Sequence, residues 1–133
     1  MDKLLFIDDE EGIRKVLGIS LTDRGYRVHT ADSGPAALQL FSEFHPAIVL
    51  TDIKMPDMDG IELLRNIKSR RPETEVIMFT GHGDMDLAIK SVKYEATDFV
   101  TKPIDFEDLE LTIEKTVGQV RALREAREAR EKV

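Results

Sequence analysis

The chain alternates between two hydrophobic patterns. Short, continuous apolar runs, such as residues 4–7 and 47–50, are typical of strands that are buried on both faces. Between such runs, apolar residues recur every three or four positions, as at Ile61, Leu64 and Ile67, and this spacing predicts amphipathic helices. The predicted strands span residues 4–7, 26–31, 47–50, 76–80 and 98–101.

Predicted strands and helices alternate five times with short connections. Parallel strands need crossover connections of this kind, and the crossovers place helices on both faces of the sheet. We therefore expect an α/β fold with a doubly wound, five-stranded parallel sheet. The last helix is predicted to run from about residue 106 toward the chain end, with apolar positions at Leu109, Ile113, Val117, Val120 and Leu123.

Composition narrows the class of protein. With 133 residues, the chain has the length of one domain, and its 41% hydrophobic and 34% charged residues are ordinary for a globular protein. The absence of cysteine excludes disulfides, thiolate zinc sites and a cysteine nucleophile. No apolar run approaches the ~20 residues needed to cross a bilayer, and the start of the chain lacks a signal-peptide pattern. We expect a cytoplasmic protein without a membrane partner.

Charge divides the chain into two segments. The net charge of −7 argues against direct binding to nucleic acid or to anionic lipid, because both need a basic surface. Residues 121–133 nevertheless carry a net +2, which leaves −9 on residues 1–120. We expect a domain over residues 1–120 and, over 121–133, a charged helical extension that serves as a linker. The chain is then either a single-domain regulator or, as we favour, a segment of a longer protein.

Candidate chemistry is concentrated where the predicted strands end, which is where open α/β sheets bind ligands. Strand ends carry Asp8 and Asp9, then Asp52, then Thr80, and finally Lys102. Three carboxylates from adjacent strands would repel one another unless a cation lay among them. Because the cluster offers only oxygen ligands, the sequence predicts Mg²⁺.

A lysine and a hydroxyl beside such a cluster are suited to phosphoryl transfer. Lys102 and Thr80 could stabilise phosphoryl oxygens, while a carboxylate acts as the nucleophile. Asp52 stands alone at its strand end, whereas Asp8 and Asp9 are paired and better placed to hold metal. The expected covalent product is an aspartyl phosphate on Asp52.

At these residues the sequence resembles the receiver domain of bacterial two-component response regulators. The matching elements are Asp8-Asp9, Asp52 with the following Met-Pro-Asp-Met-Asp-Gly at 55–60, Thr80-Gly81, and Lys102-Pro103. The resemblance implies a flavodoxin-like (βα)5 fold with strand order 2-1-3-4-5. It also implies a cis peptide bond between Lys102 and Pro103.

The same resemblance implies a role for each site residue. Asp52 would be the phosphoacceptor, with Thr80 and Lys102 contacting the phosphoryl group. Mg²⁺ would be bound by Asp9, Asp52 and the backbone carbonyl of Lys54, with Asp8 acting mainly through water. Phe99 would occupy an aromatic switch position, and His82 is expected to be an exposed bystander. The implied partners are a sensor histidine kinase, an attached effector domain, and a second copy of the chain in a weak dimer after phosphorylation.

Two other functions are compatible with parts of this pattern. A Mg²⁺-dependent phosphohydrolase with an aspartate nucleophile is one, but such enzymes of the haloacid-dehalogenase type carry Asp-x-Asp after the first strand, and Asp8 and Asp9 are adjacent. A phosphorylation-independent interaction module is the other, and the presence of Asp9, Asp52, Thr80 and Lys102 argues against it. We expect a signalling switch whose only catalysis is its own phosphorylation and dephosphorylation, not an enzyme acting on other molecules.

Overall fold

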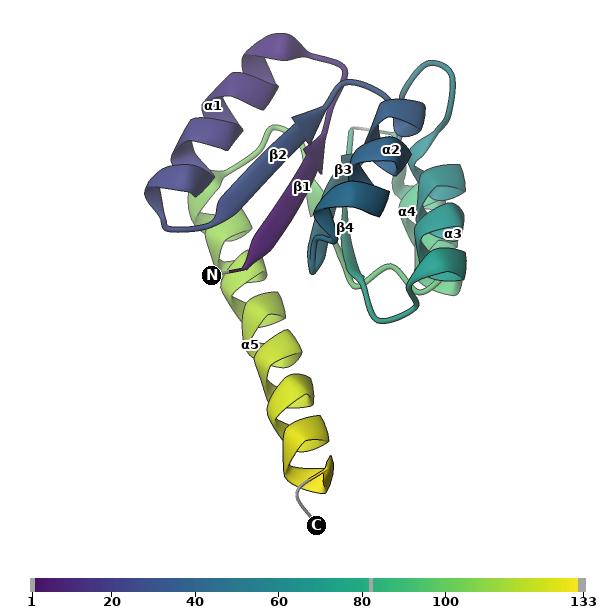
Figure 1. The fold of residues 1–133 in the computed structure, drawn as a ribbon. Helices are drawn as coiled ribbons and strands as arrows, with labels where there is room; N and C mark the ends of the chain where they lie inside the picture. The colour runs from purple at the N-terminus through teal and green to yellow at the C-terminus, as the bar shows by residue number, and fades with distance from the viewer. Residues whose placement is uncertain (1, 82, 132–133) are drawn as a thin grey trace.

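The computed structural model describes residues 2–81 and 83–131 and contains a five-stranded parallel sheet flanked by helices. Strands and helices alternate strictly along the chain (Figure 1). Their bounds are β1 Lys3–Ile7, α1 Glu11–Asp23, β2 Arg27–Ala31, α2 Gly34–Phe44, β3 Ile48–Asp52, α3 Gly60–Arg70, β4 Glu75–Thr80, α4 Met85–Lys93, β5 Asp98–Thr101 and α5 Phe106–Glu131.

The strand order is β2-β1-β3-β4-β5, and every neighbouring pair is parallel. The predicted fold class and strand order are therefore confirmed. The third strand differs from its prediction, since it starts one residue later and continues through Thr51 and Asp52. Thr51 pairs with Ile7 and Met78, so the sheet continues through these polar residues, which the apolar pattern alone did not include.

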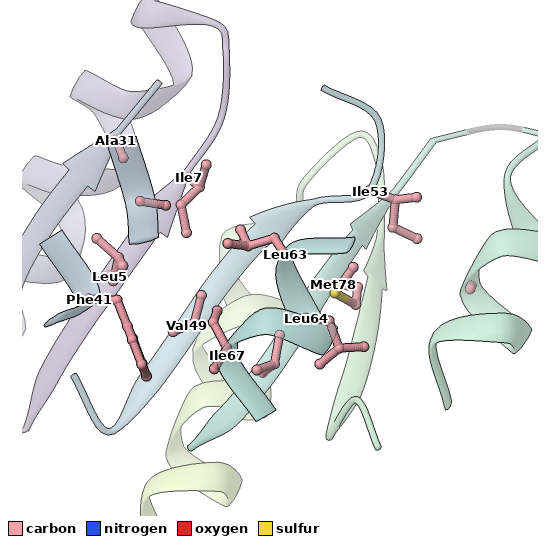
Figure 2. Close-up of a cluster of buried hydrophobic side chains, with 13 residues drawn as sticks. Leu5, Ile7, Ala31, Phe41, Val49, Ile53, Leu63, Leu64, Ile67 and Met78 are labelled. Carbon is pink, nitrogen blue, oxygen red and sulfur yellow. The ribbon is translucent and has the colours of Figure 1, made fainter. Parts of the chain in front are cut away.

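Two apolar cores lie on opposite faces of the sheet, because alternate side chains of each strand point to opposite sides. On one face, α2, α3 and α4 pack against residues such as Leu5, Val49 and Met78 (Figure 2). On the other face, α1 and α5 pack against residues such as Phe6 and Leu50. Each buried strand thus contributes to both cores, as its continuous apolar pattern predicted.

Helix ends follow the local signals of the sequence. Ser33 caps α2 by accepting a hydrogen bond from the amide of Ala36 at 3.3 Å. Gly25, which follows α1, has a φ of 96°. Asp105 accepts hydrogen bonds from the amides of Glu107 and Asp108 at the start of α5. These residues mark where α2 and α5 begin and where α1 ends.

Helix α5 continues well beyond the sheet (Figure 1). Leu109, Ile113 and Val117 are buried against the sheet, whereas Leu123 is 61% exposed. The apolar spacing predicted the helix correctly, but only its first half packs on the domain. None of the helices in the described part of the chain has the length and apolar composition needed to cross a membrane.

Candidate functional site

The sequence-predicted site residues meet at the carboxyl edge of the sheet. Asp8 and Asp9 directly follow β1, Asp52 is the last residue of β3, and Thr80 is the last residue of β4. Lys102 directly follows β5, where Thr101 pairs with Thr80. The parallel register thus brings together side chains that are up to 94 positions apart in the sequence.

One lysine forms ion pairs with two buried carboxylates at this edge. Lys102 Nζ lies 2.7 Å from Asp52 Oδ2 and 3.5 Å from Asp8 Oδ2. Asp8 is completely buried and Asp52 nearly so, while the Lys102 side chain is 23% exposed. The lysine neutralises only one of the two negative charges, so the buried site keeps an excess of negative charge.

Burial and charge shift the ionisation of these groups. Burial raises the pKa of Asp8 above its ordinary value, although the hydrogen bond from the Glu10 amide and the charge of Lys102 partly oppose this rise. Burial by itself would lower the pKa of Lys102, but its hydrogen bond to Asp52 and the charges of Asp52 and Asp8 outweigh burial and raise that pKa. Lys102 therefore remains a cation at neutral pH, whereas ionised Asp8 is costly to keep buried.

Asp8, Asp9 and Asp52 form the acidic cluster that the sequence predicted. One carboxylate oxygen from each lies within 4.8 Å of the others, and Asp9 is exposed to solvent. A hard divalent cation fits this donor set, since Mg²⁺ prefers carboxylate oxygens and retains some of its water. The exposed Asp9 leaves room for such water molecules, and the excess negative charge favours a cation.

The hydroxyl of Thr80 forms no hydrogen bond with any of the described residues, although Thr80 is only 1% exposed. A buried hydroxyl without a partner is costly, because it has lost its hydrogen bonds to water. Its position at the end of β4, next to β3 and β5, places it beside Asp52 and Lys102. Such a hydroxyl is ready to donate a hydrogen bond to a group that enters the site.

The loop from Ile53 to Asp59 is held tightly next to Asp52. The Gly60 amide donates a 2.6 Å hydrogen bond to the Ile53 carbonyl, and a Cβ on Gly60 would lie 2.8 Å from Ile53 Cα. Only glycine allows this close approach of the two backbones. Asp59 then caps α3 by accepting a 2.8 Å hydrogen bond from the Glu62 amide. The tight loop therefore fixes the position of Lys54, which lines a cleft of about 550 Å³ together with Asp9.

An ion pair that the sequence did not reveal joins this loop to the start of α4. Lys54 Nζ lies 2.8 Å from Asp84 Oδ1, and the other oxygen of Asp84 accepts a hydrogen bond from the Gly81 amide at 3.2 Å. The hydrogen bond from Lys54 lowers the pKa of Asp84. Aspartate directly before a helix is a familiar capping signal, but the Asp84 side chain makes no capping hydrogen bond to α4. The sequence position of Asp84 thus suggests helix capping, whereas in the structure its side chain pairs with Lys54.

The remaining predicted site features are placed as follows. Phe99 is partly buried and packs against the core beneath α2, α3 and α4. The Lys102–Pro103 peptide bond is cis, as the resemblance implied. His82, the expected bystander, lies outside the described residues.

The family model described as "Response regulator receiver domain" matches residues 4–114. The chain belongs to this family. The receiver matches Regulatory protein AtoC of Escherichia coli with 35% identity over 117 residues, which is 88% of this chain and 25% of AtoC. It matches Transcriptional regulatory protein FixJ of Rhizobium meliloti with 41% identity over 102 residues, 77% of this chain and 49% of FixJ. The receiver thus spans between a quarter and a half of the length of these relatives.

A solved structure supports the same family. The crystal structure of a response regulator receiver domain protein from Clostridium thermocellum superposes with a TM-score of 0.89 and 37% identity, covering 92% of this chain and 99% of that chain. Receiver domains are signalling modules, and the chain has the acidic cluster at which this family binds Mg²⁺. The phosphohydrolase alternative is therefore not favoured, and the chain is a response regulator receiver domain.

Proposed function

We propose that Asp52 accepts a phosphoryl group from a sensor histidine kinase. The observation that carries this proposal is the convergence of three groups at adjacent strand ends. They are the Asp52 carboxylate, the Lys102 ammonium at 2.7 Å from it, and the Thr80 hydroxyl, which forms no hydrogen bond within the described part of the chain. These are a nucleophile, a cation and a hydrogen-bond donor, which phosphoryl transfer requires. The roles of the individual residues follow from this arrangement.

In the transfer, an Asp52 carboxylate oxygen attacks phosphorus, so that a P–O bond forms while the P–N bond of the donor phosphohistidine breaks. Lys102 already donates to Asp52 Oδ2, and a new phosphoryl oxygen offers it a more strongly charged acceptor. The Thr80 hydroxyl can donate to a second oxygen. In a separate hydrolysis step, a water molecule attacks phosphorus, the P–O bond to Asp52 breaks, and inorganic phosphate leaves with the protons of that water while the Asp52 carboxylate is regenerated. The only catalysis by the receiver would then be its own phosphorylation and dephosphorylation.

Mg²⁺ is the cofactor that we assign to this site. Asp9, Asp52 and the backbone carbonyl of Lys54 would bind it directly, and Asp8 would act mainly through water. When bound, the ion neutralises negative charge on the phosphoryl oxygens and on the carboxylates. The three carboxylates, which lie within 4.8 Å of one another, are the support for this assignment. Asp9→Asn should weaken Mg²⁺ binding, seen as a smaller rise in melting temperature on adding Mg²⁺.

Output would pass to an attached effector domain through the extension over residues 121–133, of which residues 132 and 133 lie outside the described part. The phosphoryl group adds roughly two negative charges, which should draw Lys102 and Thr80 toward it. Phe99 would then move into the space that Thr80 leaves. A weak dimer of phosphorylated chains completes the proposal.

Phosphorylation by acetyl phosphate with Mg²⁺, followed by intact mass spectrometry, tests this function. We expect the mass of one added phosphoryl group on the natural chain and none on Asp52→Asn. The matched control is Asp57→Asn, which changes an exposed aspartate in the neighbouring loop and should label normally. Equal labelling of Asp52→Asn would overturn the assignment of the nucleophile. An unlabelled natural chain would favour the phosphorylation-independent interaction module.

A further inference from the structure

Helix α5 changes its surroundings at Gly118. Leu109, Ile113 and Val117 are buried before this residue, and Val120 is still partly buried after it. From residue 121 to residue 131, every residue is exposed. Figure 1 shows this second half of α5 extending away from the sheet. Gly118 therefore lies where the helix loses its packing against the domain.

Neither packing nor backbone conformation requires glycine at this position. A Cβ on Gly118 would meet no described atom within 4 Å, and its φ lies outside the left-handed region. Glycine is among the least favourable residues in a helix interior, because it has the most conformational freedom to lose. Gly118 thus weakens the helix at the point where tertiary contacts stop supporting it.

One ion pair spans this weak point. Arg121 Nη2, three residues beyond Gly118, lies 3.3 Å from Asp2 Oδ2. Asp2 is largely buried, and its carbonyl accepts a hydrogen bond from the Arg27 amide at 3.1 Å, which holds it at the start of the sheet. Within the described chain, this is the hydrogen bond that ties the helix beyond Gly118 to the domain. We term the Asp2–Arg121 pair the strap.

The first half of α5 is held independently of the strap. Glu110 forms an ion pair with Arg24, which follows α1, and three apolar residues anchor the same half in the core. The strap itself borders a cleft of about 340 Å³ that Tyr26, Glu114 and Gly118 also line. Loss of the strap should therefore free the second half of α5 and leave the first half in place.

We propose that Gly118 is a hinge and that the strap holds α5 straight across it. The direction in which residues 119–131 leave the domain then depends on one ion pair, whose arginine is 63% exposed. Because this arginine is open to solvent, salt and competing charges can weaken the pair, although Asp2 is largely buried. A binding partner that engages Asp2 or Arg121 would release the helix without unfolding the domain, which makes this joint a control point for whatever follows the helix.

Pulsed electron paramagnetic resonance can test the hinge, because the chain has no cysteine and accepts two spin labels cleanly. One label at Gln39→Cys in α2 and one at Ala129→Cys in α5 occupy exposed positions. We call the chain that carries only these two labelled cysteines the parent. In the parent we expect a narrow distribution of the distance between the two labels. Arg121→Gln should broaden it at least twofold, and adding Gly118→Ala to that variant should narrow it again, since alanine restores helix stiffness.

The matched control is Arg124→Gln, which removes the same charge from an exposed position one helical turn away and should leave the distribution narrow. Asp2→Asn should broaden the distribution as Arg121→Gln does, which separates loss of the strap from a local effect on the helix. Raising NaCl from about 0.1 M to about 1 M should broaden the parent but not its Gly118→Ala variant. An unchanged distribution in Arg121→Gln, or a broad one that Gly118→Ala fails to narrow, overturns the proposal.

Discussion

The two ends of the sheet both carry ion pairs, but their charges balance differently. At the amino end, Asp2 pairs with Arg121, and Glu110 pairs with Arg24, so each acid has its own base. At the carboxyl end, Lys102 faces two buried carboxylates and a third lies nearby. The arginines are 63% and 57% exposed, whereas Lys102 is mostly buried.

This difference separates a structural cluster from a functional one. An ion pair whose arginine stays exposed contributes little to stability, and because each acid has its own base, no charge is left for another group to satisfy. Buried carboxylates in excess over their lysine oppose folding, because desolvated like charges repel one another. A bound cation would offset the excess negative charge. The Thr80 hydroxyl, which forms no hydrogen bond with any described residue, could then donate one to an incoming group.

The largest expected effect on stability comes from removing Lys102, the cation that contacts the two buried carboxylates at the carboxyl end. Without Mg²⁺, Lys102→Met should destabilise the protein by about 3 kcal/mol, since it removes the cation that contacts two buried carboxylates. Arg24→Met at the amino end should cost less than about 1 kcal/mol. Urea unfolding compares the two variants. Mg²⁺ should restore part of the lost stability in Lys102→Met but not in Arg24→Met. Equal losses of stability in the two variants would contradict the proposed difference between the two ends of the sheet.

Asp8 should oppose folding at neutral pH. Because burial raises its folded-state pKa, the ionised form is disfavoured in the folded protein, and its contribution to stability falls as pH rises above the unfolded value of 3.8. Without Mg²⁺, Asp8→Asn should therefore be more stable than the natural chain at pH 7, and this advantage should shrink toward pH 4. Urea unfolding across this range measures it, and a constant difference would contradict the expectation.

Relieving a strained turn at the amino end of the sheet should change the free energy of unfolding by an intermediate amount. Glu95, between α4 and β5, has a φ of 70°, a conformation that costs side chains with a Cβ about 1 kcal/mol but suits glycine. Glu95→Gly should raise the free energy of unfolding by up to about 1 kcal/mol, while Glu95→Ala, which keeps the Cβ, should not. Thermal unfolding distinguishes the two variants. Phosphorylation should be unchanged in both, because the turn lies at the opposite end from Asp52.

The smallest effect is expected from breaking the ion pair between Lys54 and Asp84, a matched pair that lies at the carboxyl end. Lys54 lowers the pKa of Asp84, so this pair stabilises the folded state above the unfolded pKa of 3.8, and the stabilisation is lost as pH falls through the folded pKa. Lys54→Gln should raise the Asp84 pKa toward its ordinary value. Carbon-detected NMR titration of the carboxyl groups measures this change, and Lys90→Gln in α4 is the control. An unshifted Asp84 in Lys54→Gln would show that the ion pair is not formed in solution.

Local patterns along the chain predicted most of the fold. Continuous apolar runs predicted the buried strands, and apolar residues three and four positions apart predicted the helices, including α5 as far as Leu123. The convergence of Asp8, Asp52, Thr80 and Lys102 was also predictable, because the carboxyl ends of parallel strands meet at one edge. The bounds of β3 were less accurate, since Thr51 and Asp52 extend the strand with polar side chains.

The sequence by itself therefore determined the elements, their order and the residues at the strand ends, because short-range patterns and the geometry of parallel sheets specify these. Only the tertiary structure decided which distant charges meet, as in Lys54–Asp84 and in Asp2–Arg121, which are 119 positions apart. It also decided that Leu109 is buried and Leu123 exposed, although both fit one helical pattern. The physical reason is that burial and ion pairing depend on where the sheet ends in space, and no local pattern records that distance.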